Sequence, residues 1–127
     1  MTKFKVVLIL FSAIIFTNCS SDDTAPVNTN KSVRYYAIIS PTEDTNVLKT
    51  VTYTNFNGNV ETENVAIFNK TISVPIGTVV SLSASGSTTG VLNIIARVEI
   101  YIDNQLAVSQ QNDGPGAASA TVSITVQ

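Results

Sequence analysis

Paired carboxylates are the first residues in this sequence whose types and spacing could support catalysis. Glu61 and Glu63 lie two positions apart, so in a strand both would project from one face, where burial can separate the pKa values of two acids for general acid–base work. Few apolar residues surround them, and a solvated strand face is the favoured interpretation. Glu43 and Asp44 also lie together, and we interpret them as a solvated turn after Pro41.

Oxygen ligands and nucleophiles give no stronger indication of chemistry. Asp103–Asn104 and Asn112–Asp113 could supply oxygen ligands for Ca²⁺, but the EF-hand spacing is absent and turn formation explains both pairs. The sequence contains no His, which removes the usual general base and the commonest metal ligand. No group is placed to activate its Ser and Thr residues as nucleophiles. We therefore expect no catalytic residue, no metal site and no cofactor, and we predict that the protein is not an enzyme.

The tyrosines are the remaining residues that could contact a ligand or a partner. Tyr35 and Tyr36 are adjacent, so in a strand one of them must face outward. Tyr101 lies on the polar side of its strand, whereas Tyr53 shares a face with Val51. An exposed Tyr can stack on a sugar ring or contact a protein, although packing is the commoner role of aromatic side chains on sheet faces.

The charge balance bears on possible partners. Charged residues make up only 13% of the sequence, compared with about 25% in typical domains. Removal of an N-terminal segment holding Lys3 and Lys5 would leave five cationic side chains against nine carboxylates, a net charge of −4. Nucleic-acid binding needs clustered cations, so we do not expect a nucleic-acid partner.

The N-terminal segment has the pattern of an export signal. Basic residues at Lys3 and Lys5 precede an apolar stretch over residues 6–16. That stretch is too short for a membrane span, which needs about 20 residues, and fits the 7–15 residues of a signal-peptide core. We predict a cleaved signal peptide over residues 1–18, with a very short retained anchor as the alternative.

The only cysteine, Cys19, follows this apolar stretch directly. A single Cys cannot form an internal disulfide, so an unused or intermolecular thiol is one interpretation. Residues 16–19 also resemble a bacterial lipobox, whose Cys becomes the first residue and carries acyl chains. This resemblance implies lipidation of Cys19 and attachment of the protein to a membrane.

The residues after Cys19 are similar to the acidic export signal of surface lipoproteins of Bacteroidota, with a plain solvated linker as the alternative. The resemblance implies an outer-membrane lipoprotein at the cell surface, and a periplasm-facing orientation stays open. Thr24 lies in a three-residue segment that fits the O-glycosylation motif of the same phylum. The residues that carry the export resemblance are Ser20, Ser21, Asp22 and Asp23.

Linker composition continues through residue 32, which predicts a lipidated Cys and flexible tether over 19–32 and a folded domain over 33–127. Within the domain, apolar residues alternate with other residues, most clearly over 92–102 and 118–126. This period of two predicts an all-β fold, an Ig-like antiparallel β-sandwich of about 7–8 strands. The expected strands are about 33–39, 47–54, 59–68, 70–75, 78–84, 91–102, 105–110 and 118–126, with loops at 85–90 and 112–116.

Two neighbouring residues test this pattern. Ile100 belongs to the apolar face of its strand, and Glu99 belongs to the opposite face. We therefore expect Ile100 in the core and Glu99 at the solvated surface.

The domain resembles the membrane-anchored MmpS-type proteins of mycobacteria in the order of its strand and turn motifs. The compared motifs are Val51-Thr-Tyr-Thr, Gly58, Thr71-Ile-Ser-Val, Leu82-Ser-Ala and Val98-Glu-Ile-Tyr-Ile-Asp. The resemblance implies an Ig-like sandwich and an accessory role with an RND-type envelope transporter. The residues themselves favour a non-catalytic, lipid-anchored envelope domain that binds an unidentified protein or glycan. An outward-facing adhesive or glycan-binding module is the alternative.

Overall fold

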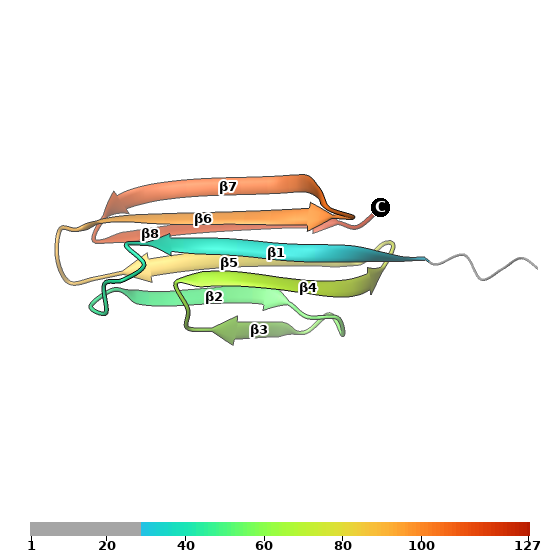
Figure 1. Cartoon of the computed structure of the whole chain (residues 1–127), viewed down its shortest axis with the longest axis horizontal. Helices are drawn as coiled ribbons and strands as arrows, with labels where there is room; N and C mark the ends of the chain where they lie inside the picture. The colour runs from blue at the N-terminus through green and yellow to red at the C-terminus, as the bar shows by residue number, and fades with distance from the viewer. Residues whose placement is uncertain (1–28) are drawn as a thin grey trace, which may run out of the picture.

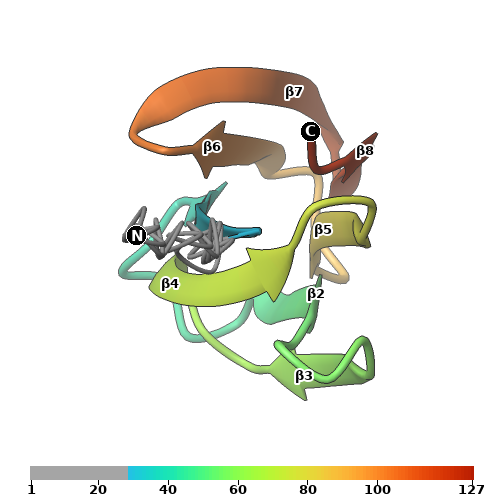
Figure 2. The same cartoon turned by 90° about the vertical axis from the view of Figure 1, so that its right-hand side faces the viewer.

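The computed structural model describes residues 29–127, which form two antiparallel four-stranded sheets packed face to face (Figures 1 and 2). Sheet A has the strand order β4-β1-β6-β7, and sheet B has the order β3-β2-β5-β8. The expected antiparallel β-sandwich is therefore confirmed. The strands are β1 (Asn30–Ser40), β2 (Leu48–Thr54), β3 (Val60–Glu63), β4 (Ile67–Pro75), β5 (Val79–Ser87), β6 (Asn93–Ile102), β7 (Gln105–Pro115) and β8 (Ala117–Thr125).

The N-terminal predictions lie outside the described residues. These are the signal peptide over 1–18, lipidation at Cys19, the export signal and the glycosylation of Thr24. The N-terminal end of β1 and the C-terminus of the chain lie at the same end of the sandwich (Figure 1).

The core forms from the inward-facing residues of both sheets, as the alternation predicts. In β1, Val33, Tyr35, Ala37 and Ile39 are fully buried. The Tyr35 side chain crosses the core, and its hydroxyl donates a hydrogen bond of 2.8 Å to the backbone carbonyl of Thr54 on the other sheet. Burial without a partner would cost the hydroxyl several kcal/mol in an apolar medium, so this bond is what permits a tyrosine at this depth.

The expected third strand, 59–68, is wrong. β3 ends at Glu63, the chain crosses from sheet B to sheet A over residues 64–66, and Ile67 and Phe68 already belong to β4. The backbone N–H of Ile39 bonds the Ala66 carbonyl at 2.8 Å, which fixes the crossing segment beside β1. Val65 is partly buried against the core, so the apolar pattern continues through the crossing and conceals it.

The loop expected over residues 85–90 begins only at Thr88, because β5 continues to Ser87. Gly86 lies inside this strand, facing the core. A Cβ atom at this position would lie 2.6 Å from Cγ2 of Ile39 and 2.7 Å from Cγ2 of Ile94. The glycine is therefore required by close approach of the two sheets rather than by loop flexibility.

The loop expected over 112–116 is also wrong, because residues 112–115 extend β7 and only Gly116, with φ of 75°, makes the turn to β8. Two amide side chains explain the extension. The backbone N–H of Thr121 donates to Oε1 of Gln110 at 2.8 Å, and Nδ2 of Asn112 donates to the Ser119 carbonyl at 2.7 Å. Side chains of β7 thus satisfy the free edge of β8 and close one side of the sandwich, where β7 and β8 meet in Figure 2.

Gly86→Ala should destabilise the domain by about 1–3 kcal/mol, because a methyl group must displace Ile39 or Ile94 in a packed core. Gly90→Ala is the matched control, since a Cβ atom there meets no atom closer than 4.0 Å. Urea unfolding of both variants measures the difference. An equal, small effect of the two substitutions would contradict the placement of Gly86.

Candidate functional site

The two outer faces of the sandwich differ in chemistry. Outward positions of sheet B carry mainly hydroxyl groups, which bond one another across strands, as in Ser83–Thr121 at 2.8 Å and Thr54–Ser81 at 3.0 Å. Many of the Ser and Thr residues of the sequence therefore form the outer surface of sheet B, where such cross-strand pairs stabilise the sheet. The hydroxyl positions are Thr50, Thr52, Thr54, Thr62, Ser81, Ser83, Ser85, Ser87, Ser119, Thr121, Ser123 and Thr125.

The outer face of sheet A instead gathers charged and aromatic side chains. We call this set the arginine–tyrosine face: Arg34 and Tyr36 on β1, and Arg97, Glu99 and Tyr101 on β6. They alternate with core residues, so the pleat directs them away from sheet B. The set contains both arginines of the sequence and two of its four tyrosines.

Glu99 is the centre of this face. The Tyr101 hydroxyl donates to Oε2 of Glu99 at 2.6 Å, and Nη2 of Arg97 donates to Oε1. The guanidinium carbon of Arg34 lies 4.0 Å from the centroid of the Tyr101 ring, within the range of a cation–π interaction. The four side chains therefore form one connected network across β1 and β6.

The electrostatic balance at Glu99 combines opposing effects. Burial alone raises the pKa of the Glu99 carboxyl, but the hydrogen bonds from Tyr101 and Arg97 and the charges of Arg97 and Arg34 outweigh it and hold the pKa below its usual value. The hydrogen bond to Glu99 in turn raises the pKa of the Tyr101 hydroxyl. Glu99 is thus a stable anion that organises the groups around it.

The sequence assigned Glu99 to the correct face but was wrong about its solvation. Ile100 is fully buried in the core, as expected, whereas Glu99 is itself only 4% exposed. β6 is an interior strand of sheet A, so Glu99 lies between Tyr36 on β1 and Ser109 on β7. The burial of Glu99 therefore depends on strand order. One sequence signal could have indicated it: the Arg-x-Glu-x-Tyr spacing places Arg97 and Tyr101 on the same face of the strand as Glu99, where both can donate hydrogen bonds to its carboxylate.

A second polar cluster joins the two sheets at the opposite side of the sandwich, where β3 and β4 are edge strands. The Tyr53 hydroxyl donates to Oε2 of Glu61 at 2.5 Å and accepts from Nζ of Lys70 at 2.7 Å, while Nδ2 of Asn55 donates to Oε1 of Glu61 at 2.7 Å. Glu61 comes from sheet B and Lys70 from sheet A. Glu61 is exposed but is not the purely solvated carboxylate that the sequence suggested.

The alternative interpretation of Glu61 and Glu63, as paired acids for general acid–base work, has no geometric support at Glu61. Hydrogen bonds from Asn55 and then Tyr53 lower the pKa of Glu61, which is opposite to what a general acid needs. Glu61 therefore has a structural role in the link between the sheets.

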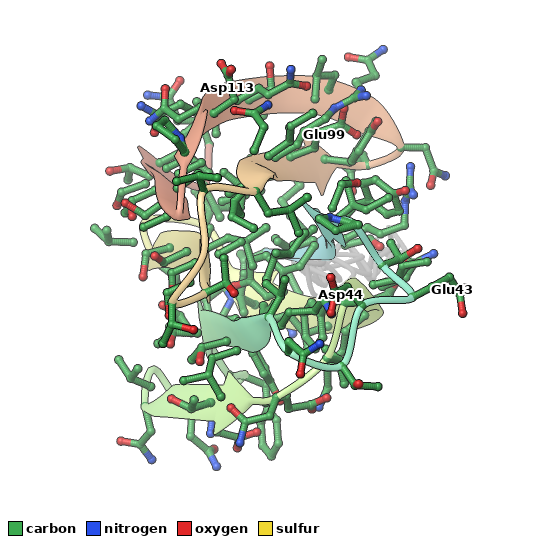
Figure 3. All side chains as sticks on the ribbon, turned by 90° about the vertical axis from the view of Figure 1, so that its left-hand side faces the viewer. Glu43, Asp44, Glu99 and Asp113 are labelled. Carbon is green, nitrogen blue, oxygen red and sulfur yellow. The ribbon has the colours of Figure 1, made fainter. Side chains whose placement is uncertain are left out.

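The other candidate ligands are dispersed. In Figure 3, Glu43 and Asp44 lie on one loop, away from Glu99 and Asp113. Residues 29–127 hold no group of three or more acidic, His or Cys side chains able to bind a metal ion. Asp103 and Asn104 form the β6–β7 turn with φ of 48° and 65°.

Asp103 is already engaged within the fold. Its Oδ1 accepts from the backbone N–H of Ser32 at 3.1 Å, and its Oδ2 accepts from Lys31 at 3.0 Å. These bonds account for its carboxylate without a bound ion.

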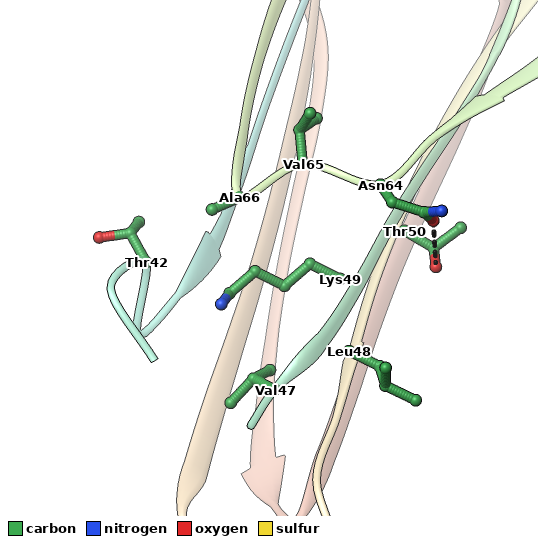
Figure 4. A pocket seen from close by; sticks show the side chains of 8 residues that line it. All are labelled: Thr42, Val47, Leu48, Lys49, Thr50, Asn64, Val65 and Ala66. Carbon is green, nitrogen blue, oxygen red and sulfur yellow. Dashed lines mark hydrogen bonds between the residues drawn. The ribbon is translucent and has the colours of Figure 1, made fainter. Parts of the chain in front are cut away.

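A groove of about 490 Å³ lies where the 41–47 loop approaches the crossing segment (Figure 4). Its one charged lining residue, Lys49, donates to the backbone carbonyl of Asp44. Thr50 and Asn64 contact each other at 3.5 Å across its wall. The groove therefore lacks the free recognition groups that the arginine–tyrosine face has.

No family model matches the sequence, and a comparison with curated proteins finds no match. In the described part of the chain no helix is long and apolar enough to cross a membrane. The geometry of the arginine–tyrosine face is therefore the main basis for inferring a function.

Glu99→Ala should destabilise the domain by about 1–3 kcal/mol, because it leaves the donors of Arg97 and Tyr101 without their buried acceptor. Ile100→Ala should cost about 2–5 kcal/mol through a core cavity. Gln111→Ala, an exposed change on the same face, should stay within about 0.5 kcal/mol. Chemical denaturation at neutral pH compares the three variants.

The contribution of Glu99 should also depend on pH. Because its folded pKa is lowered, its stabilisation is present above the unfolded value of about 4.3 and is lost as the pH falls through the folded pKa. The stability difference between wild type and Glu99→Gln should therefore shrink in acid. A Glu99→Ala effect no larger than that of Gln111→Ala would contradict the buried network.

Tyr53→Phe should raise the pKa of Glu61 toward the ordinary glutamate value, because it removes one of the two hydrogen bonds that stabilise the carboxylate. NMR titration of the side-chain carboxyl group measures this shift. Thr62→Ala, one residue away on the outer face, should leave the Glu61 pKa unchanged. Equal titration of Glu61 in wild type and Tyr53→Phe would show that the link between the sheets does not form.

Proposed function

We propose that this protein is a non-catalytic binding domain of the cell envelope, held at the membrane by lipid attached to Cys19. The observation that carries the proposal is the arginine–tyrosine face. Arg and Tyr are residue types that dominate recognition surfaces, and here Arg97 and Tyr101 are held on the outer side of sheet A by hydrogen bonds to the buried carboxylate of Glu99.

The placement of the chain ends supports the membrane attachment. β1 begins at one end of the sandwich (Figure 1), and a tether of residues 19–29 would span at most about 40 Å if fully extended. A domain so attached keeps the side of sheet A accessible to other molecules near the membrane surface. We propose the outer leaflet of the outer membrane as its location, on the resemblance of residues 20–23 to a surface export signal.

A glycan-binding role is the second candidate function, and Tyr36 is the observation that favours it. The side chain of Tyr36 is only partly buried on an exposed sheet face, where its ring can stack on a sugar. The alternative role as a transporter subunit rests on the MmpS-type resemblance alone, and co-purification with a pump would test it.

Cells that express the wild-type protein should incorporate a clickable fatty acid into it, and Cys19→Ala should abolish the label. Loss of residues 1–18 would be measured by mass spectrometry of the same material. The acyl chains contribute about 0.8 kcal/mol per buried CH₂ group, so the labelled protein should stay with the membrane fraction.

Ser20→Ala is the matched control for this experiment, because it changes the neighbouring residue and leaves the thiol intact. Label retained by Cys19→Ala, or absent from the wild-type protein, would refute the lipid anchor.

A further inference from the structure

The end of the sandwich at which β1 begins, called here the tether end, exposes large apolar side chains. The turns from β2 to β3, from β4 to β5 and from β6 to β7 all lie at this end (Figures 1 and 2). The backbone N–H of Ile76, in the β4–β5 turn, donates to the carbonyl of Thr29, the residue before β1, at 2.7 Å. This turn therefore lies beside the point where the tether joins the domain. The exposed large apolar residues of the tether end are Phe56, Val60, Ile76, Val79 and Leu106.

Two of these turns carry an apolar residue at a position that turn chemistry does not explain. A hydrogen bond of 3.0 Å from the N–H of Gly58 to the Asn55 carbonyl makes Phe56 the second of four turn residues. The turn 75–78 is closed by a bond of 3.2 Å from the N–H of its last residue to the carbonyl of its first, which gives Ile76 the same position. Pro is favoured there, and polar residues and Gly dominate turns in general. Phe56 is 65% exposed and Ile76 is 49% exposed, so core packing does not explain them either.

The β2–β3 turn is held in one shape by its own hydrogen bonds. Oδ1 of Asn55 accepts from the backbone N–H groups of Asn57 at 2.9 Å and Asn59 at 3.0 Å. Gly58 has a φ of 81°, which favours glycine. Phe56 is thus presented to solvent by an ordered turn, and an ordered turn loses little conformational entropy when it binds.

The opposite end of the sandwich also exposes apolar side chains, but its charges differ. Its exposed large apolar residues are Leu48, Ile67, Val91 and Leu92. Figure 3 looks onto this end and labels three of its carboxylates, Glu43, Asp44 and Asp113. None of the three forms an ion pair within residues 29–127. Lys49 lies nearby but donates to the backbone carbonyl of Asp44.

The side-chain carboxylates of the tether end already have partners. Asp103 forms an ion pair of 3.0 Å with Lys31, and Glu61 accepts hydrogen bonds from Tyr53 and Asn55. An ionised carboxylate is costly to remove from water unless it is paired or hydrogen-bonded. The tether end is therefore better suited than the opposite end to contact with an apolar medium.

We propose that the tether end docks on the surface of a lipid bilayer, with Phe56, Ile76 and Leu106 inserted at the level of the headgroups. Apolar side chains of interfacial helices insert about 5–10 Å, to the boundary between headgroups and acyl chains, and apolar turn residues can reach the same depth. This inference rests on the proposed lipid anchor at Cys19 and adds a second contact that orients the domain on the membrane.

The tether makes a weak affinity for the bilayer sufficient. Residues 19–29 span at most about 40 Å, so a lipid anchor would hold the turns near the surface at an effective concentration of about millimolar. Docking by the tether end directs the strands away from the membrane. The arginine–tyrosine face then lies on the side of the domain, where a binding partner can reach it.

The absence of Trp from the sequence allows one introduced indole to report on one position. The test uses the full-length protein, expressed with its N-terminal segment and reconstituted in phosphatidylcholine vesicles with brominated acyl chains. The fluorescence of Phe56→Trp should fall about twofold relative to vesicles without bromine, because bromine quenches an indole that reaches the acyl boundary. Val91→Trp is the matched control at the opposite end, where Val91 is 92% exposed, and its fluorescence should not change.

A second substitution tests whether the neighbouring turn contributes. Ile76→Ser in the Phe56→Trp background should reduce the quenching, because it removes apolar surface from the docked end. Leu48→Ser in the same background is the matched control, since Leu48 is 75% exposed at the opposite end, and it should leave the quenching unchanged. Thermal melts check that all variants fold.

Flotation of the vesicles on a density gradient distinguishes failure of this inference from failure of the proposed function. Protein that floats while Phe56→Trp is quenched no more than Val91→Trp would retain the lipid anchor and refute docking by the tether end. An equal effect of Ile76→Ser and Leu48→Ser on the quenching would also refute it. Wild-type protein that does not float with the vesicles would refute both the anchor and the docking.

Discussion

The pleat of β1 and β6 is the constraint on which the rest of the molecule depends. Both strands lie in the interior of sheet A, and their inward residues are almost all fully buried against sheet B. A slip of one residue would bury Arg34 and Arg97 and expose Tyr35 and Ile100, so the core fixes the register strongly. The same register fixes the positions of the outward arginines and tyrosines, because they alternate with the packed core residues on the same strands.

The two lateral sides of the sandwich are closed in different ways, because the free edges of strands must be satisfied or protected. At β7 and β8, amide side chains of Gln110 and Asn112 take the place of a neighbouring strand. At β3 and β4, the Tyr53 ring packs 4.8 Å from that of Phe68, and its hydroxyl joins Glu61 to Lys70. Polar side chains thus tie the sheets together at both margins of an aliphatic core.

The alternation of apolar and polar residues was sufficient to predict features that depend on a single strand. Features that depend on the order of the strands in the sheets could not be predicted from it. The sandwich, the burial of Ile100 and the outward direction of Glu99 follow from alternation within single strands. The crossing at residues 64–66, the packing of Gly86 and the extension of β7 depend on contacts with distant strands, which no window of the sequence contains. The arginine–tyrosine face was missed for the same reason, since Arg34 and Tyr101 become neighbours only when β1 pairs with β6.

Glu99 connects stability with recognition in this protein. A buried carboxylate is costly unless charged and hydrogen-bonding partners offset the loss of water, and here those partners are Arg97, Tyr101 and, through its charge, Arg34. Two of them, Arg97 and Tyr101, are tied to Glu99 by hydrogen bonds. Side chains that are already held in place lose less conformational entropy on binding, so the buried carboxylate that contributes to stability also prepares Arg97 and Tyr101 for the binding role that we propose for this face.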